Sequence, residues 1–184
     1  VDGELRLGVT RGNKEVGDDV TANGWILEGT TLIPSDSPAT ATYTLEWKDK
    51  DAAELVLDTR ELTIEKVEAI DAQGNASPLL FTLADADKVF GSRLTIETPR
   101  QPAKVAITYR TAPTASGLQW LEPSMTEGKQ LPFMFSQSQA IHARSWVPLQ
   151  DTPSVRFTYS AKVSSRPDVM VLMSADNDPK AARD

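Results

Sequence analysis

The sequence predicts an all-β protein: a saddle-shaped or sandwich-like domain of about ten short strands in mixed sheets, with little helix. Three observations lead to this prediction. Apolar and polar residues alternate with period two in several segments, and polar turns separate those segments. No long segment shows the 3.6-residue period of an amphipathic helix. The 184 residues can bury one sizeable core and are expected to form a single β domain over 1–184.

The first forty residues give the weakest strand signals. Leu5, Leu7 and Val9 would share one face of a strand over 4–9, and residues 25–33 form a looser apolar run. A Gly-rich, charged turn region over 11–19 separates them. The Pro- and Ser-rich residues 33–40 predict a loop.

The clearest alternation begins at Thr40, after which every second residue up to Trp47 is apolar. Further strands are expected over 54–58, 62–70, 79–83, 93–97, 104–110, 155–163 and 169–173, with short apolar pieces at 118–123 and 133–135. In 62–70 the apolar phase slips near Glu65 and Lys66, which indicates a β-bulge. Residues 71–75 predict the turn that leads into the returning strand at 79–83.

Composition restricts the partners and the compartment. The net charge of −7 argues against nucleic acid or anionic lipid as the main partner. The chain has no cysteine, which excludes disulfides and thiolate metal sites, and no apolar run approaches the roughly 20 residues of a membrane span. A cysteine-free chain fits either the cytoplasm or a bacterial periplasmic or exported location. Because the sequence begins at Val1 and not at Met, we expect a processed or expressed fragment.

Catalytic motifs are sparse. A Ser-His-Asp triad would have to use the single histidine, His142, with a nearby serine and Asp151, but a lone histidine in an apolar turn is more often a hydrogen-bonded packing residue. Residues 84–89 lack the length and glycine of a calcium loop, and there is no H-E-x-x-H, nucleotide-binding glycine motif or Walker loop. Nothing singles out two of the 26 acidic residues as a glycosidase pair. We therefore assign no catalytic and no metal-binding residue to this chain.

Residues 137–153 carry the most distinctive polar pattern. Gln137 and Gln139 would point to the same side of an extended segment and could hold a peptide backbone; alternatively they satisfy the backbone of their own turn, which residue-level reasoning favours. Arg144 and Asp151 bracket a turn that contains Pro148, and we expect a bidentate salt bridge that pins it. Pro153 would then fix the path into the last strands.

These residues also resemble a known family. Residues 118–163 and the segment ELVLDTRELTIEKVEAI resemble the amino-terminal domain of zinc aminopeptidases, the gluzincins of the aminopeptidase N and leukotriene A-four hydrolase family, with bacterial cold-active aminopeptidases among the nearest members. The family pattern R-x-x-x-P-x-x-D-x-P is matched by Arg144, Pro148, Asp151 and Pro153, and a Gln-x-Gln precedes it. The resemblance covers roughly Tyr43 to Met173.

The resemblance implies a saddle-shaped β domain that packs on a thermolysin-like catalytic domain. In the family that second domain carries the zinc and its H-E-x-x-H motif, and the glutamine pair lines the substrate channel near the peptide's amino terminus. Gln137, Ser138 and Gln139 become candidate substrate-binding residues, and Arg144, Pro148, Asp151 and Pro153 a structural clamp. Zinc is expected in the catalytic domain of the parent enzyme and not in this chain.

The sequence also departs from the family pattern. Residues 1–40 match poorly, 41–174 match the β domain, and 175–184 read as a frayed tail toward a catalytic domain that is missing. Without H-E-x-x-H, this chain alone is expected to be inactive. The alternative is a free-standing β-sandwich module that binds carbohydrate or protein, using its four tryptophans as a platform. A large exposed apolar patch beside residues 137–151 would favour the severed domain over the module.

Overall fold

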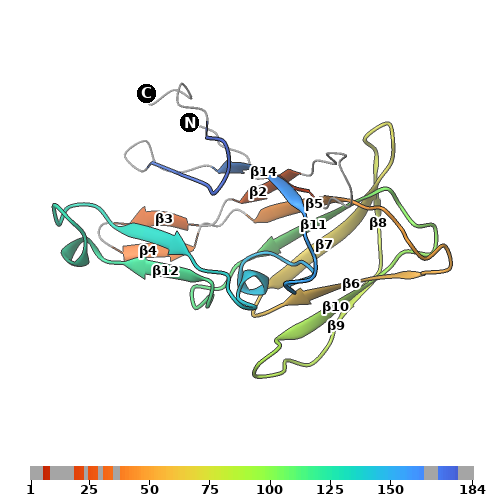
Figure 1. The fold of residues 1–184 in the computed structure, drawn as a ribbon, viewed down its shortest axis with the longest axis horizontal. Helices are drawn as coiled ribbons and strands as arrows, with labels where there is room; N and C mark the ends of the chain where they lie inside the picture. The colour runs from red at the N-terminus through yellow and green to blue at the C-terminus, as the bar shows by residue number, and fades with distance from the viewer. Residues whose placement is uncertain are drawn as a thin grey trace.

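The chain folds as two facing β-sheets with smaller hairpins at one end (Figure 1). The structure is a computed structural model and describes residues 6–8, 19–22, 25–28, 31–34, 38–163 and 170–177. Within these residues the strands are β1 Arg6–Gly8, β2 Asp19–Ala22, β3 Trp25–Glu28, β4 Thr31–Pro34, β5 Ala39–Thr44, β6 Glu54–Thr59, β7 Thr63–Ile70, β8 Ala76–Pro78, β9 Phe81–Leu83, β10 Ser92–Glu97, β11 Lys104–Arg110, β12 Leu118–Leu121, β13 Phe133–Ser136 and β14 Thr158–Val163. Two single-turn 3-10 helices join them, η1 Pro123–Met125 and η2 Ala143–Ser145.

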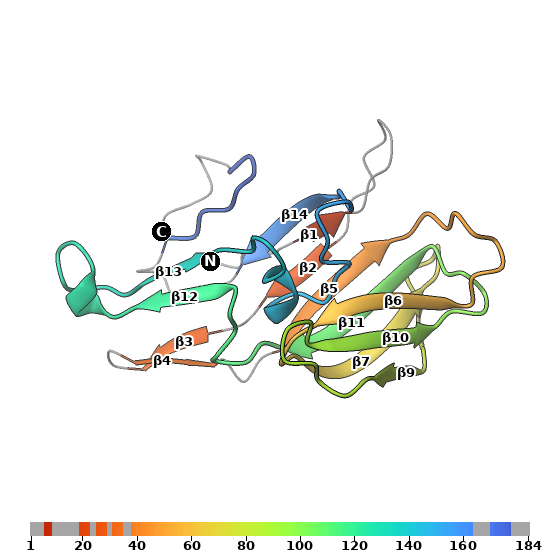
Figure 2. The ribbon, with the colours of Figure 1, turned by 60° about the horizontal axis from the view of Figure 1, so that its bottom comes forward.

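The larger sheet has seven strands in the order β1-β14-β2-β5-β11-β7-β8. Its neighbours are antiparallel except for β14 and β2, which run parallel, so the sheet is mixed as predicted. The smaller sheet has the order β6-β10-β9 and lies across one face of the larger one (Figure 2). The all-β prediction with little helix is therefore confirmed. The described residues form more strands than the ten or so expected, because strands of three or four residues are too short to show a clear alternation in the sequence.

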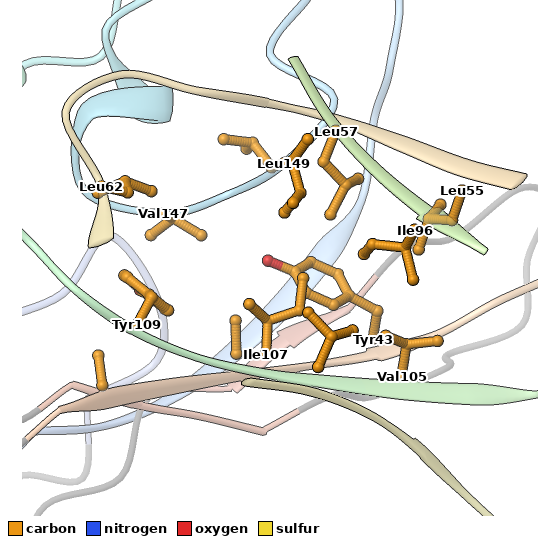
Figure 3. Close-up of a cluster of buried hydrophobic side chains, with 14 residues drawn as sticks. Tyr43, Leu55, Leu57, Leu62, Ile96, Val105, Ile107, Tyr109, Val147 and Leu149 are labelled. Atoms are coloured by element: carbon orange, nitrogen blue, oxygen red, sulfur yellow. The ribbon is translucent and has the colours of Figure 1, made fainter. Parts of the chain in front are cut away.

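The core lies between the two sheets and follows from the period-two pattern (Figure 3). In β11 the inward residues Val105, Ile107 and Tyr109 are at most 1% exposed. They face residues of the smaller sheet such as Leu57 and Ile96, which are also buried. Each such aliphatic side chain stabilises the fold by about 1.5–3 kcal/mol.

The segment after η2 closes this core from one side. Val147 is 1% and Leu149 is 7% exposed, and both belong to the core cluster. Leu149 also exchanges two backbone hydrogen bonds with Asp58 of β6, at 2.7 and 3.2 Å. Residues 147–149 are therefore fixed by both packing and pairing, and they support the polar segment that precedes them.

Local predictions had mixed outcomes. The bulge is confirmed: β7 pairs with β11 in a register that skips Glu65. The returning strand expected at 79–83 is wrong in its partner: Phe81–Leu83 pairs with β10 in the other sheet, and the strand that returns on β7 is Ala76–Pro78. The strand expected over 169–173 is wrong for residues 170–173, which have no regular structure. The turn expected over 11–19 lies largely outside the described residues.

One hairpin stands apart from the two sheets. Strands β12 and β13 pair antiparallel, with Leu118 opposite Ser136 and Leu121 opposite Phe133. In both views this hairpin points away from the β6-β10-β9 sheet (Figures 1 and 2). In the part of the chain that the structure describes, no helix is long and apolar enough to cross a membrane.

Candidate functional site

The glutamine pair lies directly after β13, where the hairpin returns to the body of the domain. Gln137 and Gln139 are both exposed, and Ser138 between them is half-buried. The extended conformation ends at Ser138, and Gln139 begins a turn that runs to His142. The same-side geometry expected for an extended pair therefore does not apply to Gln139.

Each residue of the turn has a different bonding role. The Gln139 backbone N–H donates to Gln137 Oε1 at 3.2 Å, so Gln137 serves its own turn through one amide atom. Ser138 Oγ accepts a hydrogen bond from Trp146 Nε1 at 3.3 Å, which directs the hydroxyl toward the domain. The Gln139 side chain has no hydrogen bond to any other described residue. Of the two glutamines, Gln139 is thus the one whose whole side-chain amide is available to a ligand.

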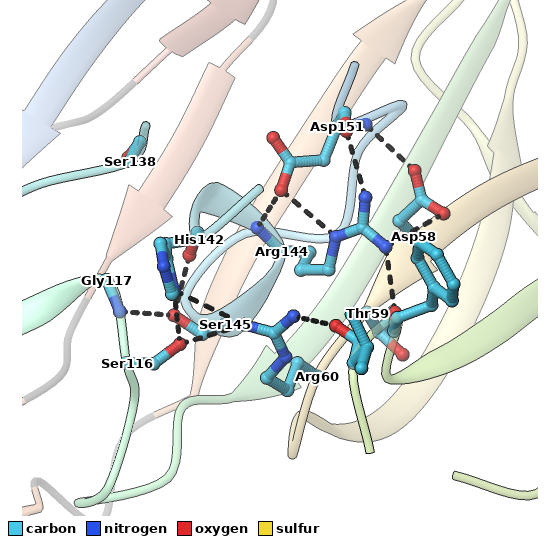
Figure 4. Close-up of polar contacts among 12 residues, drawn as sticks. Asp58, Thr59, Arg60, Ser116, Gly117, Ser138, His142, Arg144, Ser145 and Asp151 are labelled. Carbon is cyan, nitrogen blue, oxygen red and sulfur yellow. Dashed lines mark hydrogen bonds and ion pairs between the residues drawn. The ribbon is translucent and has the colours of Figure 1, made fainter. Parts of the chain in front are cut away.

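Arg144 is the centre of a buried polar network (Figure 4). It is 4% exposed, and its Nε lies 3.1 Å from Asp151 Oδ2, while its Nη2 donates to the Asp151 carbonyl oxygen at 2.9 Å. Its Nη1 donates to Phe90 O at 2.7 Å and lies 3.4 Å from Asp58 Oδ1. The predicted partners are therefore together, but the contact is not a two-pronged fork onto one carboxylate. The guanidinium instead joins two carboxylates and two carbonyl groups.

The same network fixes the backbone of the turn. Asp151 Oδ2 also accepts from the Arg144 backbone N–H at 3.1 Å, and Asp58 Oδ2 accepts from the Asp151 N–H at 2.9 Å. Pro148 is buried, and its carbonyl accepts a hydrogen bond from the Tyr43 hydroxyl. Pro153 is exposed in the turn that follows. A buried guanidinium with this many acceptors is a rigid support, because each acceptor would be left unsatisfied if it moved.

His142 does not assemble a catalytic triad. Its Nδ1 lies 2.9 Å from Ser116 Oγ and 3.3 Å from Arg60 Nη1 (Figure 4). Ser145 is fully buried and its Oγ donates to the His142 carbonyl oxygen at 2.7 Å, while Asp151 is engaged by Arg144. The third group is therefore a cation where a triad needs a carboxylate, which disfavours the hydrolase hypothesis.

Five exposed apolar side chains lie on β13 and in the connection of the β12–β13 hairpin. Phe133, Met134 and Phe135 are 54%, 42% and 36% exposed, and the ring centroids of Phe133 and Phe135 are 6.1 Å apart. Met125 and Leu131 in the connection are 66% and 46% exposed. We call these five residues the hairpin patch. It adjoins Gln137 in the chain, which is where the sequence argument placed an uncovered domain surface.

The described residues do not fit a zinc site. They contain no group of three or more His, Cys, Asp or Glu side chains arranged to hold a metal ion. The chain has one histidine and no cysteine, so a typical zinc donor set is lacking.

The structure adds four residues to the site that sequence reasoning missed: Asp58, Arg60, Ser116 and Gly117. Asp58 is the last residue of the strand expected over 54–58 and Arg60 lies just after it, while Ser116 and Gly117 directly precede the apolar piece expected at 118–123. Their partners lie 20 to about 93 positions further along the chain. No local pattern reports contacts of that range.

Comparisons with known proteins report which sequences the chain resembles. The sequence model of the family described as Peptidase M1 N-terminal domain matches residues 36–183. The chain is 41% identical over 145 residues to leukotriene A-4 hydrolase of Xenopus laevis, covering 76% of this chain and 23% of that protein. It is 38% identical over 164 residues to leucine aminopeptidase 2-2 of Scheffersomyces stipitis, covering 88% and 23% respectively.

The chain is also similar to a solved structure. Native yeast LTA4 hydrolase matches with a TM-score of 0.54 at 34% identity, over 65% of this chain and 18% of that one. The chain thus spans about a quarter or less of the length of these relatives. The resemblance to bacterial members stays a prediction, because these relatives come from Xenopus and from fungi.

Proposed function

The chain belongs to the M1 peptidase N-terminal domain family, and from this premise we propose that it is the amino-terminal β domain of a zinc metallo-aminopeptidase. In this proposal the whole protein removes amino-terminal residues from peptides, and its zinc is held by a catalytic domain outside this chain. The β domain packs on that catalytic domain and provides one wall of the substrate channel. The single observation that carries the proposal is the exposed Gln139 amide at the foot of the hairpin patch.

The hairpin patch supports the packing part of the proposal. Single exposed apolar residues are ordinary, but the Phe133 and Phe135 rings lie side by side on one face of β13, and exposed apolar side chains that gather on one hairpin usually mark an interface. The patch lies on the element that carries the glutamines, so covering it with the catalytic domain would bring Gln139 to the channel. The buried network of Arg144 and Asp151 would hold the turn at that boundary and act as the structural clamp.

The glutamine amides support the binding part. An aminopeptidase must recognise a free ammonium group, and amide oxygens can complete the hydrogen bonds around it while carboxylates supply the charge. The Gln139 side-chain amide has no hydrogen bond to a described residue, whereas Gln137 Oε1 already accepts one from the Gln139 N–H. We therefore assign the principal substrate contact to Gln139, with Gln137 and Ser138 as secondary contacts.

The free-standing module is not favoured. A sugar platform needs exposed indole faces, but Trp47 and Trp146 pack against the core cluster and Trp120 is half-buried. The Trp25 side chain lies outside the described residues. The tryptophans described here are thus committed to packing.

Two measurements test the proposal. The gene that encodes this chain should continue past the codon for Asp184 into an H-E-x-x-H motif, and its absence would refute the proposal. In the full-length protein, Gln139→Ala should raise KM for an aminoacyl p-nitroanilide about fivefold, the effect of one lost hydrogen bond of about 1 kcal/mol. Gln119→Ala is the matched control, because Gln119 is also exposed but lies on β12. Equal effects of the two variants would contradict the assigned contact.

A further inference from the structure

We propose that His142 is the positioning residue of the Gln137–Gln139 turn, which it holds through both its backbone and its ring. The consequence for substrate rests on the proposed function; the positioning itself does not. Figure 4 shows the contacts of the His142 ring, which join Arg60 directly after β6, Ser116 in the loop before β12 and His142 directly before η2.

The backbone of His142 closes the turn that contains Gln139. The His142 N–H donates to Ser138 O at 3.0 Å, so Gln139, Ala140 and Ile141 are enclosed between the two partners. On its other side, the His142 carbonyl accepts from Ser145 Oγ at 2.7 Å and from the Ser145 N–H at 3.1 Å. His142 is therefore fixed to η2 by its carbonyl and to the turn by its amide.

The ring of His142 anchors this junction to the rest of the domain. Arginine can only donate, so in the 3.3 Å contact with Arg60 Nη1 the His142 Nδ1 atom is the acceptor. Ser116 Oγ accepts from Arg60 Nη1 at 3.0 Å and can donate to Nδ1 at 2.9 Å. Arg60 itself is held by Val89 O, which accepts from Nη2. One acceptor atom thus links the turn to two other segments.

The neighbour of Ser116 holds the opposite end of the turn. Gly117 O accepts from the Gln137 N–H at 2.9 Å, and the Gly117 N–H donates to Ser145 Oγ at 2.8 Å. A Cβ at position 117 would lie 2.5 Å from His142 O and 2.8 Å from Trp146 Cδ1, so only glycine permits this approach. The turn is therefore hydrogen-bonded to Gly117 at Gln137 and to His142 at Ser138. Gly117 and His142 are in turn both hydrogen-bonded to Ser145.

This frame, together with the hydrogen bond from the Gln139 N–H to Gln137 Oε1, sets the position of Gln139. The Gln139 side chain is exposed and has no hydrogen bond to another described residue. The core is supported separately, through Val147 and Leu149. Loss of the His142 ring contacts should therefore loosen the turn while the domain remains folded.

The experiment compares three variants of the full-length protein. His142→Leu removes the acceptor, His142→Asn supplies Oδ1 near the place of Nδ1, and Ser116→Ala removes one donor without touching His142. Lys129→Ala is the control, because Lys129 bonds Ser124 O at the far end of the hairpin. Hydrogen exchange of the peptide covering 138–142 is measured by mass spectrometry, together with kcat and KM for an aminoacyl p-nitroanilide.

The inference predicts exchange about tenfold faster in 138–142 for His142→Leu and a smaller increase for Ser116→Ala, with His142→Asn and the control close to the parent. KM should rise about fivefold in His142→Leu with kcat little changed, and the Asn variant should restore it. Unchanged exchange in both His142→Leu and Ser116→Ala overturns the inference. If His142→Leu does not fold, Ser116→Ala decides the matter by the same exchange measurement. Faster exchange with unchanged KM supports the positioning role and instead refutes the substrate contact of Gln139.

Discussion

Replacing Arg144 with methionine is the sharpest test of the structural clamp. The side chain is 4% exposed, and Asp151, whose carboxylate it contacts at 3.1 Å, is 8% exposed. Methionine fills much of the same volume but leaves the Asp151 carboxylate and the carbonyls of Phe90 and Asp151 without the guanidinium. Removing one partner of a buried ion pair costs about 3–5 kcal/mol. We expect a loss near the middle of that range, because Asp58 is partly exposed and water can compensate there.

The assay is urea unfolding of the 184-residue chain at neutral pH, followed by tryptophan fluorescence. With an m-value of about 2 kcal/mol/M, a 4 kcal/mol loss lowers the midpoint by about 2 M. The matched control is Arg93→Met, because Arg93 is exposed on β10 and should cost less than about 0.5 kcal/mol. Asp58→Asn should cost less than about 1 kcal/mol, since that side chain is 39% exposed and the amide oxygen can still accept from the Asp151 N–H. A midpoint shift for Arg144→Met no larger than that of Arg93→Met would refute the reasoning.

Three further outcomes follow from other parts of the domain. Replacing Phe133 and Phe135 with serine should leave urea unfolding of the isolated chain within about 0.5 kcal/mol, because both rings are exposed, yet lower the melting temperature of the full-length protein, whose interface they would line; equal effects on both would contradict the interface. Hydrogen bonds from the Phe90 and Val89 amides lower the pKa of Asp87 below 3.8, so their stabilisation of the loop is present above that pH and is lost as the pH falls through the lowered value; an NMR titration of the two amides in parent and Asp87→Asn chains checks this. Burial raises the pKa of Tyr109 above 10.0, so the folded state holds that proton more tightly, and the resulting stability is present below pH 10.0 and is lost at higher pH; tyrosinate absorbance should rise together with unfolding, and an earlier rise would contradict the burial.

The parts of the fold that the sequence predicts are those in which a local period reflects burial. In β5 and β11 alternate residues face the core, and the phase slip near Glu65 appears as a bulge. Residues 170–173 are equally apolar but form no strand, and Met170 and Leu172 are 63% and 66% exposed. An apolar run reports a buried surface of some kind, and it cannot tell a sheet from a surface that another domain would cover.

The candidate site also has a part that local sequence predicts and a part that it does not. The spacing of Arg144 and Asp151 was sufficient to predict that they meet, because both ends of one short turn are close in space whatever the fold. The second carboxylate, Asp58, was not predictable, because its approach depends on the pairing of Leu149 with β6. For the same reason nothing local indicated that Arg60 and Ser116 meet at His142. Interactions that close a turn can be read from spacing, and interactions that anchor the turn to a sheet require the fold.

The two polar networks of the domain converge on adjacent residues. Arg60, which supports His142, donates to Val89 O, and Arg144, the centre of the clamp, donates to Phe90 O. The loop between β9 and β10 is itself preorganised: Asp87 Oδ1 accepts from the N–H groups of both residues, each at 2.7 Å. A displacement of this loop would therefore remove an acceptor from each network at once. The clamp and the network that holds the Gln139 turn therefore share one supporting loop, whose side chains Val89 and Phe90 are 59% and 64% exposed.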